Sequence, residues 1–319
     1  MINLDVKKFT EAAVLNALFV VLSVVCISIG LGNLGYIDFV VPAFVGIIFL
    51  KCDFKYAVMS CISSVLIIIF VIGNIPSGIM IIQSIILGII IAFFMKRDES
   101  IFDDLFFSSI LACILMIFVD INFSALTGYS FLQEAKSYLD FIPAQLDKFK
   151  DVIVYISISC LPFGTTMIGY ILTLLFAKKL RIEEKMTLHK SSLIKNFKRY
   201  GQFMYCSKNA VYVGIAYTVV VSIMNIFVFK DKFSYMVILL NSMMYISMYF
   251  LFHDSFSLIN KYVYEMTKSR SKLLIIQFMI LYFLAAAFRI TLIFMIMFSL
   301  CIDHKYNIKL KCREVLKSL

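Results

Sequence analysis

The chain contains no tryptophan, and it has only three histidines, four prolines and twelve glycines among 319 residues. The histidines, His189, His253 and His304, form no HExxH pattern. The sequence also lacks a GxSxG motif and a phosphate-binding glycine loop. These absences exclude the common metalloprotease, serine hydrolase and P-loop classes. We therefore expect a protein that is not an enzyme, with an intramembrane enzyme of unfamiliar motif as an alternative.

Paired cysteines are lacking as well. None of the eight cysteines belongs to a CxxC pair, and most lie inside apolar runs. Cysteines in such surroundings behave as small apolar packing residues. The acidic stretch at 98–104 does not have the ligand spacing of a known metal motif. We expect neither a disulfide framework nor a bound metal or cofactor.

Long apolar runs dominate the sequence. Hydrophobic residues make up 62% of the chain, and the mean hydropathy is +0.95. The runs lie at residues 11–30, 37–50, 57–72, 78–95, 105–126, 152–177, 210–229, 235–253 and 273–301. Because a helix of about 18 or more apolar residues can cross a bilayer, they predict an all-α polytopic transmembrane helical bundle of about eight to nine spans.

Three of these runs have lengths that do not suit one upright span. The runs at 37–50 and 57–72 are short, so their helices would tilt little or draw on flanking residues. The run at 273–301 is too long for an upright span and short for a hairpin. We expect that last segment to tilt, bend or partly re-enter the membrane.

The positions of the basic residues predict the topology. A net charge of +10 would indicate nucleic acid binding in a soluble protein. Here the basic residues flank the runs, at 51–55 and 178–208 for example, while the loops at 32–38 and 73–78 carry none. The positive-inside rule then places the N-terminus in the cytoplasm, and we expect no nucleic acid partner. The side of the membrane on which the basic tail at 305–317 lies stays open, because nine spans would place it outside whereas its basic residues favour the cytoplasm.

The spacing of the runs divides the chain into three parts. Residues 1–177 form a six-span block with short loops, and residues 178–209 form a basic cytoplasmic linker. Residues 210–319 form a smaller helical block of two to three spans with a basic tail. The unequal span counts argue against an inverted-repeat transporter.

Two segments outside the runs carry apolar patterns of their own. In the linker, Leu188, Leu193 and Phe197 recur at helical spacing among lysines. This pattern is typical of a helix on an anionic membrane surface, and a solvated loop is the alternative. The outer loop at 127–151 mixes aromatic and charged residues around Pro143. We expect either a lid over the bundle or an interfacial helix.

Polar residues at membrane depth or in the outer loops are the candidates for substrate binding, because placing them in hydrocarbon is costly. They are Asn74, Gln83, Asp120, Asn122 and Arg289. For the amides, interhelical hydrogen bonding is the alternative role, and for the loop around Asn74 it is a simple turn. Arg289 lies near the middle of the last run, where His253 or Asp254 could pair with it. A structural ion pair is therefore the alternative for Arg289.

A small-residue pattern opens the first run. Ala13-x-x-x-Ala17 creates a flat stripe on which another helix can approach closely. Such stripes also occur inside any packed helical bundle. We expect Ala13 and Ala17 to be partner-docking residues.

Three segments together resemble the YybS-like family of predicted bacterial membrane proteins. They are FTEAAVLNALFVVLSVV at 9–25, LPFGTTMIGYILTLLFAKKL at 161–180 and MFSLCIDHKYNIKLK at 297–311. The family's opening TE-A-x-x-A pattern matches Thr10, Glu11 and Ala12, and its closing Gly-x-x-Asp pattern matches Asp303. Ser299 or Leu300 stands where a glycine is usual, and the linker lacks prolines that the family often has.

This resemblance implies a fold and a partner. The family's first six spans are similar to the substrate-binding S components of energy-coupling-factor vitamin transporters. Those proteins have six helices, cytoplasmic termini and an outward pocket roofed by loops, and an alanine stripe docks their coupling subunit. Ala13 and Ala17 match that stripe. The block at 210–319 departs from a plain S component, which puts transport by the same route in doubt.

These observations lead to one functional hypothesis and one rival. The first is an S-component-like protein of the bacterial plasma membrane that binds a small molecule, or a membrane protein such as a coupling subunit. Its pocket would lie between the fourth, fifth and sixth spans, beneath the first and third outer loops. The rival is a cell-envelope scaffold or assembly factor without a small-molecule ligand. In both cases the lipid bilayer is a partner.

Overall fold

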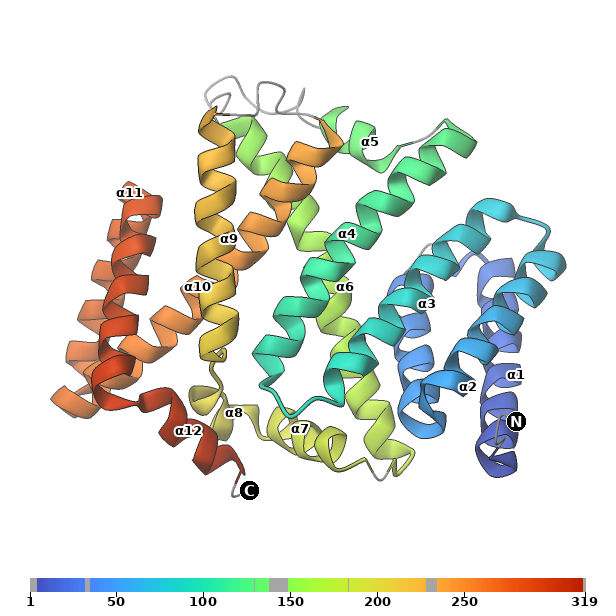
Figure 1. The fold of residues 1–319 in the computed structure, drawn as a ribbon, viewed down its shortest axis with the longest axis horizontal. Helices are drawn as coiled ribbons and strands as arrows, with labels where there is room; N and C mark the ends of the chain where they lie inside the picture. The colour runs from blue at the N-terminus through green and yellow to red at the C-terminus, as the bar shows by residue number, and fades with distance from the viewer. Residues whose placement is uncertain are drawn as a thin grey trace. The chain divides into compact units, whose positions relative to one another are not determined.

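The computed structural model describes residues 5–31, 35–128, 130–137, 149–182, 184–227 and 234–317, and these residues form helices and no strand (Figure 1). The α-helices are α1 (Val6–Ser28), α2 (Val41–Ile72), α3 (Ile75–Met95), α4 (Ile101–Thr127), α5 (Phe131–Ser137), α6 (Lys150–Lys179), α7 (Lys185–Lys195), α8 (Phe197–Tyr200), α9 (Lys208–Phe227), α10 (Tyr235–Thr267), α11 (Arg270–Tyr306) and α12 (Ile308–Lys317). A π-helical turn, η2 (Tyr36–Val40), precedes α2, and a 3-10 turn, η5 (Gly201–Phe203), precedes α9.

Eight of the described helical segments are long and apolar enough to cross a membrane. They are Val6–Ser28, Tyr36–Ile72, Gly78–Met95, Ile101–Ala125, Lys150–Lys179, Lys208–Phe227, Tyr235–Thr267 and Arg270–Tyr306. The chain is a multi-pass membrane protein, and the predicted all-α bundle of about eight to nine spans is confirmed. The count differs from the nine apolar runs because the runs at 37–50 and 57–72 both fall within one of these segments, Tyr36–Ile72.

That segment is interrupted within α2. Asp53 has non-helical backbone dihedrals, φ 69° and ψ 166°, between two helical halves. The Phe19 ring of α1 packs on Phe44 of the first half, with ring centroids 5.8 Å apart. One turn earlier, the Asn16 amide donates to Ser63 of the second half at 3.0 Å. In a straight helix residues 44 and 63 would lie about 28 Å apart along the axis, so α2 folds back at Asp53.

The last long helix has a similar interruption. Within α11, Ala287 adopts φ −148° and ψ 67°. The Thr291 hydroxyl donates to the carbonyl oxygens of both Ala287 and Phe283 at 3.0 Å. Eight residues of straight helix would span about 12 Å, so the chain turns sharply at this point. The run at 273–301 therefore bends, as one of the sequence expectations stated, and consists of two helical halves.

The chain divides into two compact units. Unit 1 comprises Met1–Asp98, Phe107–Ser192 and Phe229–Met243. Unit 2 comprises Glu99–Phe106, Leu193–Val228 and Met244–Leu319. The segment Glu99–Phe106 of unit 2 interrupts the sequence of unit 1, and the segment Phe229–Met243 of unit 1 interrupts the sequence of unit 2. The predicted domain boundaries near residues 177 and 209 stay a prediction.

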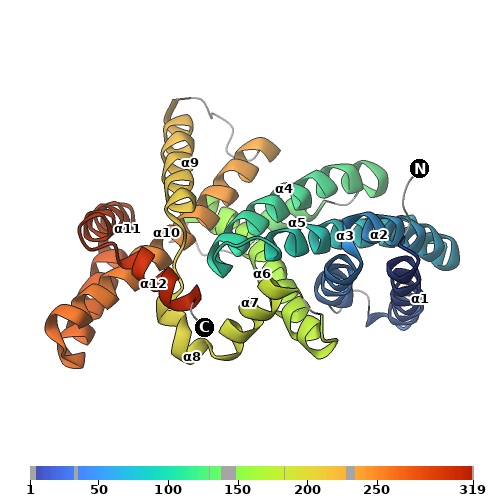
Figure 2. The same ribbon diagram turned by 60° about the horizontal axis from the view of Figure 1, so that its bottom comes forward.

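In unit 1, the helices α1, α2 and α3 lie side by side (Figure 2). Their shared core contains Phe19, Val41 and Ile68. A glycine permits the closest approach of α2 and α3. A Cβ added at Gly88 would lie 2.5 Å from the backbone carbonyl oxygen of Pro42, closer than any side chain allows.

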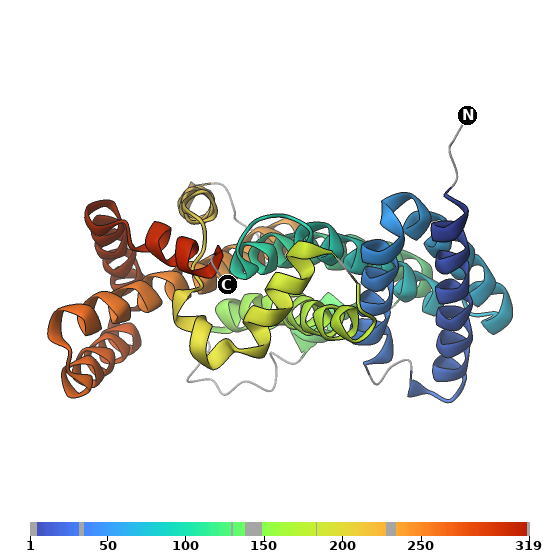
Figure 3. The same cartoon turned by 90° about the horizontal axis from the view of Figure 1, so that it is seen from below.

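In unit 2, the C-terminal helix packs against η5 (Figure 3). Ile308 and Cys312 of α12 are buried in a cluster with Tyr205 and Leu258. Asn307, with φ 49°, ends α11 and lets the chain turn into α12. The tail therefore lies at the same end of unit 2 as the segment that leads into α9.

The structure describes part of the two segments with separate apolar patterns. The linker forms the helix α7, in which Leu188 is exposed and Leu193 is buried. Of the outer loop, residues 131–137 form α5. Pro143 lies outside the described residues, as do 138–148, so the lid and interfacial-helix alternatives stay predictions.

Candidate functional site

A cavity of about 320 Å³ lies in unit 1 and is lined by η2, α3, α4 and α6. Its lining consists of Asp38, Met80, Gln83, Leu87, Ala112, Leu115, Met116, Val119, Asp120, Phe123, Leu161, Pro162 and Thr165. A cavity of this size fits an organic molecule of small to moderate size, and mostly apolar walls with a few polar groups are typical of ligand sites.

Asp120 is the buried charge of this cavity. The residue is 6% exposed. The Ser130 hydroxyl donates to its Oδ2 atom at 2.8 Å and lies 3.3 Å from the Tyr235 hydroxyl. Ser130 also caps α5, because its Oγ accepts from the Gln133 amide at 3.3 Å. These contacts fix the carboxylate of α4 in the cavity wall and connect it to the start of α5.

Three further polar side chains line the cavity. Asp38 is exposed and comes from η2, the turn that follows Gly35 with its φ of 95°. Gln83 of α3 is half-buried, one turn after Met80 on the same face. Thr165 of α6 donates its hydroxyl to the Pro162 carbonyl at 3.2 Å. Four elements that are distant in sequence therefore each supply one polar group.

The ionisable side chains among the described lining residues are acidic. Among these described residues are two carboxylates and no Lys, Arg or His. The other walls are apolar and include the thioethers of Met80 and Met116 and the ring of Phe123.

The structure separates the predicted substrate-binding residues. Gln83 and Asp120 line the same cavity, whereas Asn74, Asn122 and Arg289 are absent from its lining. Asn122 is exposed and donates its amide to the Phe118 carbonyl, one turn back on its own helix, at 2.7 Å. Asn74 is exposed in the turn between α2 and α3. Binding by these residues stays a prediction.

Arg289 lies in unit 2, two residues after the interruption of α11, and it is exposed. It forms a hydrogen bond with the Tyr245 hydroxyl of α10. Neither expected partner pairs with it in the contacts of the described residues. The His253 ring lies against the Phe102 ring at a tilt of 35°, with ring centroids 4.5 Å apart, and Asp254 is paired with Lys309.

The predicted docking residues line a groove on unit 1. Ala13 and Ala17 are exposed and border an open groove of about 510 Å³ between α1 and the second half of α2. Phe9, Asn16 and Tyr56 also line it. The small side chains leave the surface of α1 open along this groove, and partner docking there stays a prediction.

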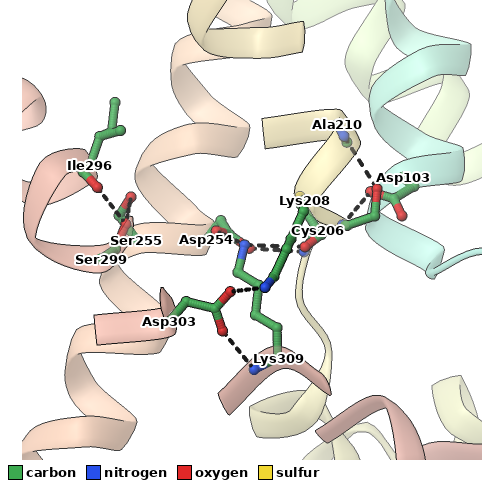
Figure 4. A network of polar contacts seen from close by, with 11 residues as sticks. Asp103, Cys206, Lys208, Ala210, Asp254, Ser255, Ile296, Ser299, Asp303 and Lys309 are labelled. Carbon is green, nitrogen blue, oxygen red and sulfur yellow. Dashed lines mark hydrogen bonds and ion pairs between the residues drawn. The ribbon is translucent and has the colours of Figure 1, made fainter. Parts of the chain in front are cut away.

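Sequence reasoning missed a network of buried carboxylates in unit 2 (Figure 4). Lys309 of α12 donates to Asp254 at 2.6 Å and to the Cys206 carbonyl at 3.2 Å. The Cys206 amide in turn donates to the other Asp254 oxygen at 2.9 Å. Asp254 is 2% exposed. The segment before α9 and the C-terminal helix are thus both attached to one buried carboxylate of α10.

Two more carboxylates complete this network. Asp303, near the end of α11, accepts from the Lys309 amide at 3.0 Å and pairs with Lys208 at 3.3 Å. Asp103 of α4 accepts from the Ser207 amide at 2.8 Å. The sequence signal for these residues was weak, because Asp103 belongs to an acidic stretch and only Asp303 belongs to a resembling motif. These carboxylates attach the segment before α9 and the C-terminal helix α12 to the rest of unit 2.

Burial changes the chemistry of the cysteine in this network. Burial raises the pKa of the Cys206 thiol, and the carboxylates of Asp254 and Asp103 raise it further. Because the thiolate is the reactive form, a thiol of this kind is inert. Cys206 therefore has a packing role.

Unit 1 contains a buried lysine with a similar structural role. Lys190 of α7 is 2% exposed, and its ammonium group donates to the carbonyls of Phe94, Met95 and Arg97 at 3.5, 3.0 and 2.7 Å. The last carbonyls of a helix have no partner within the helix and carry partial negative charge. Lys190 thus caps the C-terminus of α3 and attaches the linker helix to unit 1.

The comparisons with known proteins add no relative. No family model matches the chain, and neither a curated protein nor a solved structure is significantly similar to it. Within the described residues, no group of three or more His, Cys, Asp and Glu side chains is placed to hold a metal ion.

Proposed function

We propose that unit 1 binds a small organic molecule in the cavity between α3, α4 and α6. The observation that carries this proposal is the cavity of about 320 Å³, whose apolar walls hold the side chains of Gln83, Asp120 and Thr165. A buried carboxylate at membrane depth is a functional-site hypothesis by default, because burying it is costly for the fold. The position also agrees with the pocket expected of an S-component-like protein.

The proposed setting is the plasma membrane of a bacterium, with the N-terminus in the cytoplasm. In unit 1, Lys8 and Lys96 both pair with Asp53 at the reversal of α2. The start of α1, which carries Lys8, and the end of α3, which is followed by Lys96, therefore lie on the same side of the unit. The positive-inside rule supports the cytoplasm for that side, and the resemblance to the YybS-like family supports a bacterial source.

A second proposed role of unit 1 is docking of another membrane protein on the groove of α1. The supporting observation is that Ala13 and Ala17 are exposed along it. Replacing both with leucine would fill the groove without disturbing the buried face of α1, which contains Ala12 and Phe19. We expect this variant to lose a co-purifying membrane partner while staying monodisperse. Unchanged association would contradict the docking role.

The experiment that tests the proposed function is a purification of the tagged protein from its native host in mild detergent. Mass spectrometry then identifies both the co-purifying proteins and the retained small molecules. One stoichiometric metabolite, or a coupling subunit with its ATPases, is the expected result. Recovery of envelope proteins alone, with no small molecule, would overturn the proposal in favour of a scaffold.

A further inference from the structure

A lysine and a cysteine from two different helices of unit 2 are in direct contact. The Nζ atom of Lys261 in α10 lies 2.8 Å from the Sγ atom of Cys312 in α12. We infer that this pair is an oxidative modification site, at which hydrogen peroxide joins the two side chains through one bridging oxygen atom. The inference does not depend on ligand binding in unit 1.

The surroundings of Lys261 hold its amino group against the sulfur atom. The ring of Phe203 lies below the amino group, with Nζ 4.6 Å from the ring centroid, and such a face attracts a cation. The carboxylate of Glu265, one turn later on α10, is 4.0 Å away and largely exposed. Because a thiol is only a weak hydrogen-bond acceptor, hydrogen bonding alone is a poor reason to place a lysine there.

Burial differs between the two members of the pair. Cys312 is 2% exposed and packs in the cluster that contains Tyr205 and Leu258. The Lys261 side chain is 20% exposed, so a molecule as small as peroxide can reach the sulfur along it. Thiols of other proteins are too large to follow. The Lys261 amine is therefore the group placed to react with an oxidised Cys312.

The chemistry proceeds in two balanced steps. A first peroxide oxidises the Cys312 thiol to a sulfenic acid and leaves as water, so that sulfur loses two electrons. A second peroxide takes two electrons from the Lys261 nitrogen. One N–H bond and the sulfenic O–H bond break, an N–O bond forms, and this peroxide leaves as two waters. The sulfenic oxygen then bridges sulfur and nitrogen, and a dithiol reductant reverses the process to give thiol, amine and water.

The bridge would attach the C-terminal helix covalently. Lys261 and Cys312 are 51 residues apart in sequence and belong to α10 and α12. In the reduced protein α12 is held to α10 by the ion pair of Lys309 with Asp254. A covalent link closes a long loop and restricts the chain even where that ion pair is lost.

Peptide mass spectrometry of the full-length protein in nanodiscs tests this inference. The protein is reduced, freed of reductant, treated with hydrogen peroxide, alkylated and digested. We expect a linked pair of peptides that contain Lys261 and Cys312, with one oxygen atom gained and two hydrogen atoms lost. Dithiothreitol before alkylation should remove the link. Cys312 recovered as a free thiol or a sulfinic acid, with Lys261 unlinked, would overturn the inference.

Two lysine variants separate the bridge from general oxidation. Lys261→Arg keeps the positive charge but replaces the amine by a poorly nucleophilic guanidinium, so the link should be lost. Lys311→Arg is the matched control, because Lys311 is next to Cys312 in sequence but exposed, and the link should persist. Cys206, which is also buried, should stay unlinked in every sample. A link from Cys312 to Lys311 would contradict the assigned pair.

Limited proteolysis measures the attachment itself. In Lys309→Ala the ion pair to Asp254 is absent, and protease should cleave the tail faster than in the wild type. Peroxide should restore resistance in this variant, and dithiothreitol should abolish it again. The double variant Lys309→Ala/Lys261→Arg should gain no protection from peroxide. Equal protection of the single and double variants would overturn the attachment of α12 through this pair.

Discussion

Removing the Lys309 ammonium should destabilise unit 2 more than any other single change in the tail. In Lys309→Ala, Asp254 loses its ion pair at 2.6 Å and the Cys206 carbonyl loses a donor at 3.2 Å. Both Lys309 and Asp254 side chains are largely buried, with exposed fractions of 10% and 3%. Leaving one buried charge without its partner costs about 3–5 kcal/mol, so we expect a loss of that size.

The assay is thermal and denaturant unfolding of the purified protein in detergent, together with limited proteolysis of the tail. Lys311→Ala is the matched control, because this lysine is exposed on the same helix and its loss should change stability by less than about 0.5 kcal/mol. Adding Asp254→Asn to Lys309→Ala should recover part of the loss, since it removes the uncompensated charge. Equal stability of Lys309→Ala and Lys311→Ala would refute the reasoning.

Three other predictions concern packing and burial. Gly88→Ala should lower the melting temperature and the monodispersity of the protein, because the added Cβ would clash with the backbone of α2. Gly164→Ala is the control, since its Cβ would enter open space, and similar melting temperatures of the two variants would contradict this prediction. Cys206 should not react with maleimide in the folded protein as the pH rises through the range in which ordinary thiols ionise, because its raised pKa keeps the thiol protonated. Mass spectrometry of labelled peptides measures this, and labelling of Cys206 in the native state would contradict the prediction. Lys190→Ala should cost about 1–3 kcal/mol by leaving buried carbonyls unsatisfied, whereas the exposed Lys185→Ala should cost little; unfolding curves that coincide would argue against the cap.

The apolar runs were sufficient to predict the helices but not their interruptions. Among the described residues, each run of the sequence is helical over most of its length, because hydrocarbon requires every backbone polar group to be paired within the segment. The reversal at Asp53 had a local signal, since charged residues at 51–55 separate two short runs. The turn at Ala287 had no such local signal, because three consecutive alanines normally favour a helix. Tertiary packing overrides that preference here.

The candidate site was predictable only in part. Gln83 and Asp120 were chosen as polar residues at membrane depth, and the fold brings them to one cavity. Asn122 was chosen on the same ground, but two residues along a helix rotate the side chain by about 200°, so it faces away from Asp120. The contacts of Lys309 with Cys206 and Asp254 join residues 103 and 55 apart in sequence. No periodicity along the chain can reveal such pairs, because they depend on how the helices pack.

Native mass spectrometry of the protein released from membranes tests the central claim most directly. The wild type should carry one small-molecule adduct of defined mass. Ala112→Leu, which would fill part of the cavity from a buried position of α4, should remove that adduct without changing the folded charge-state distribution. A bare wild-type protein, or an adduct that persists unchanged in Ala112→Leu, would contradict ligand binding in this cavity.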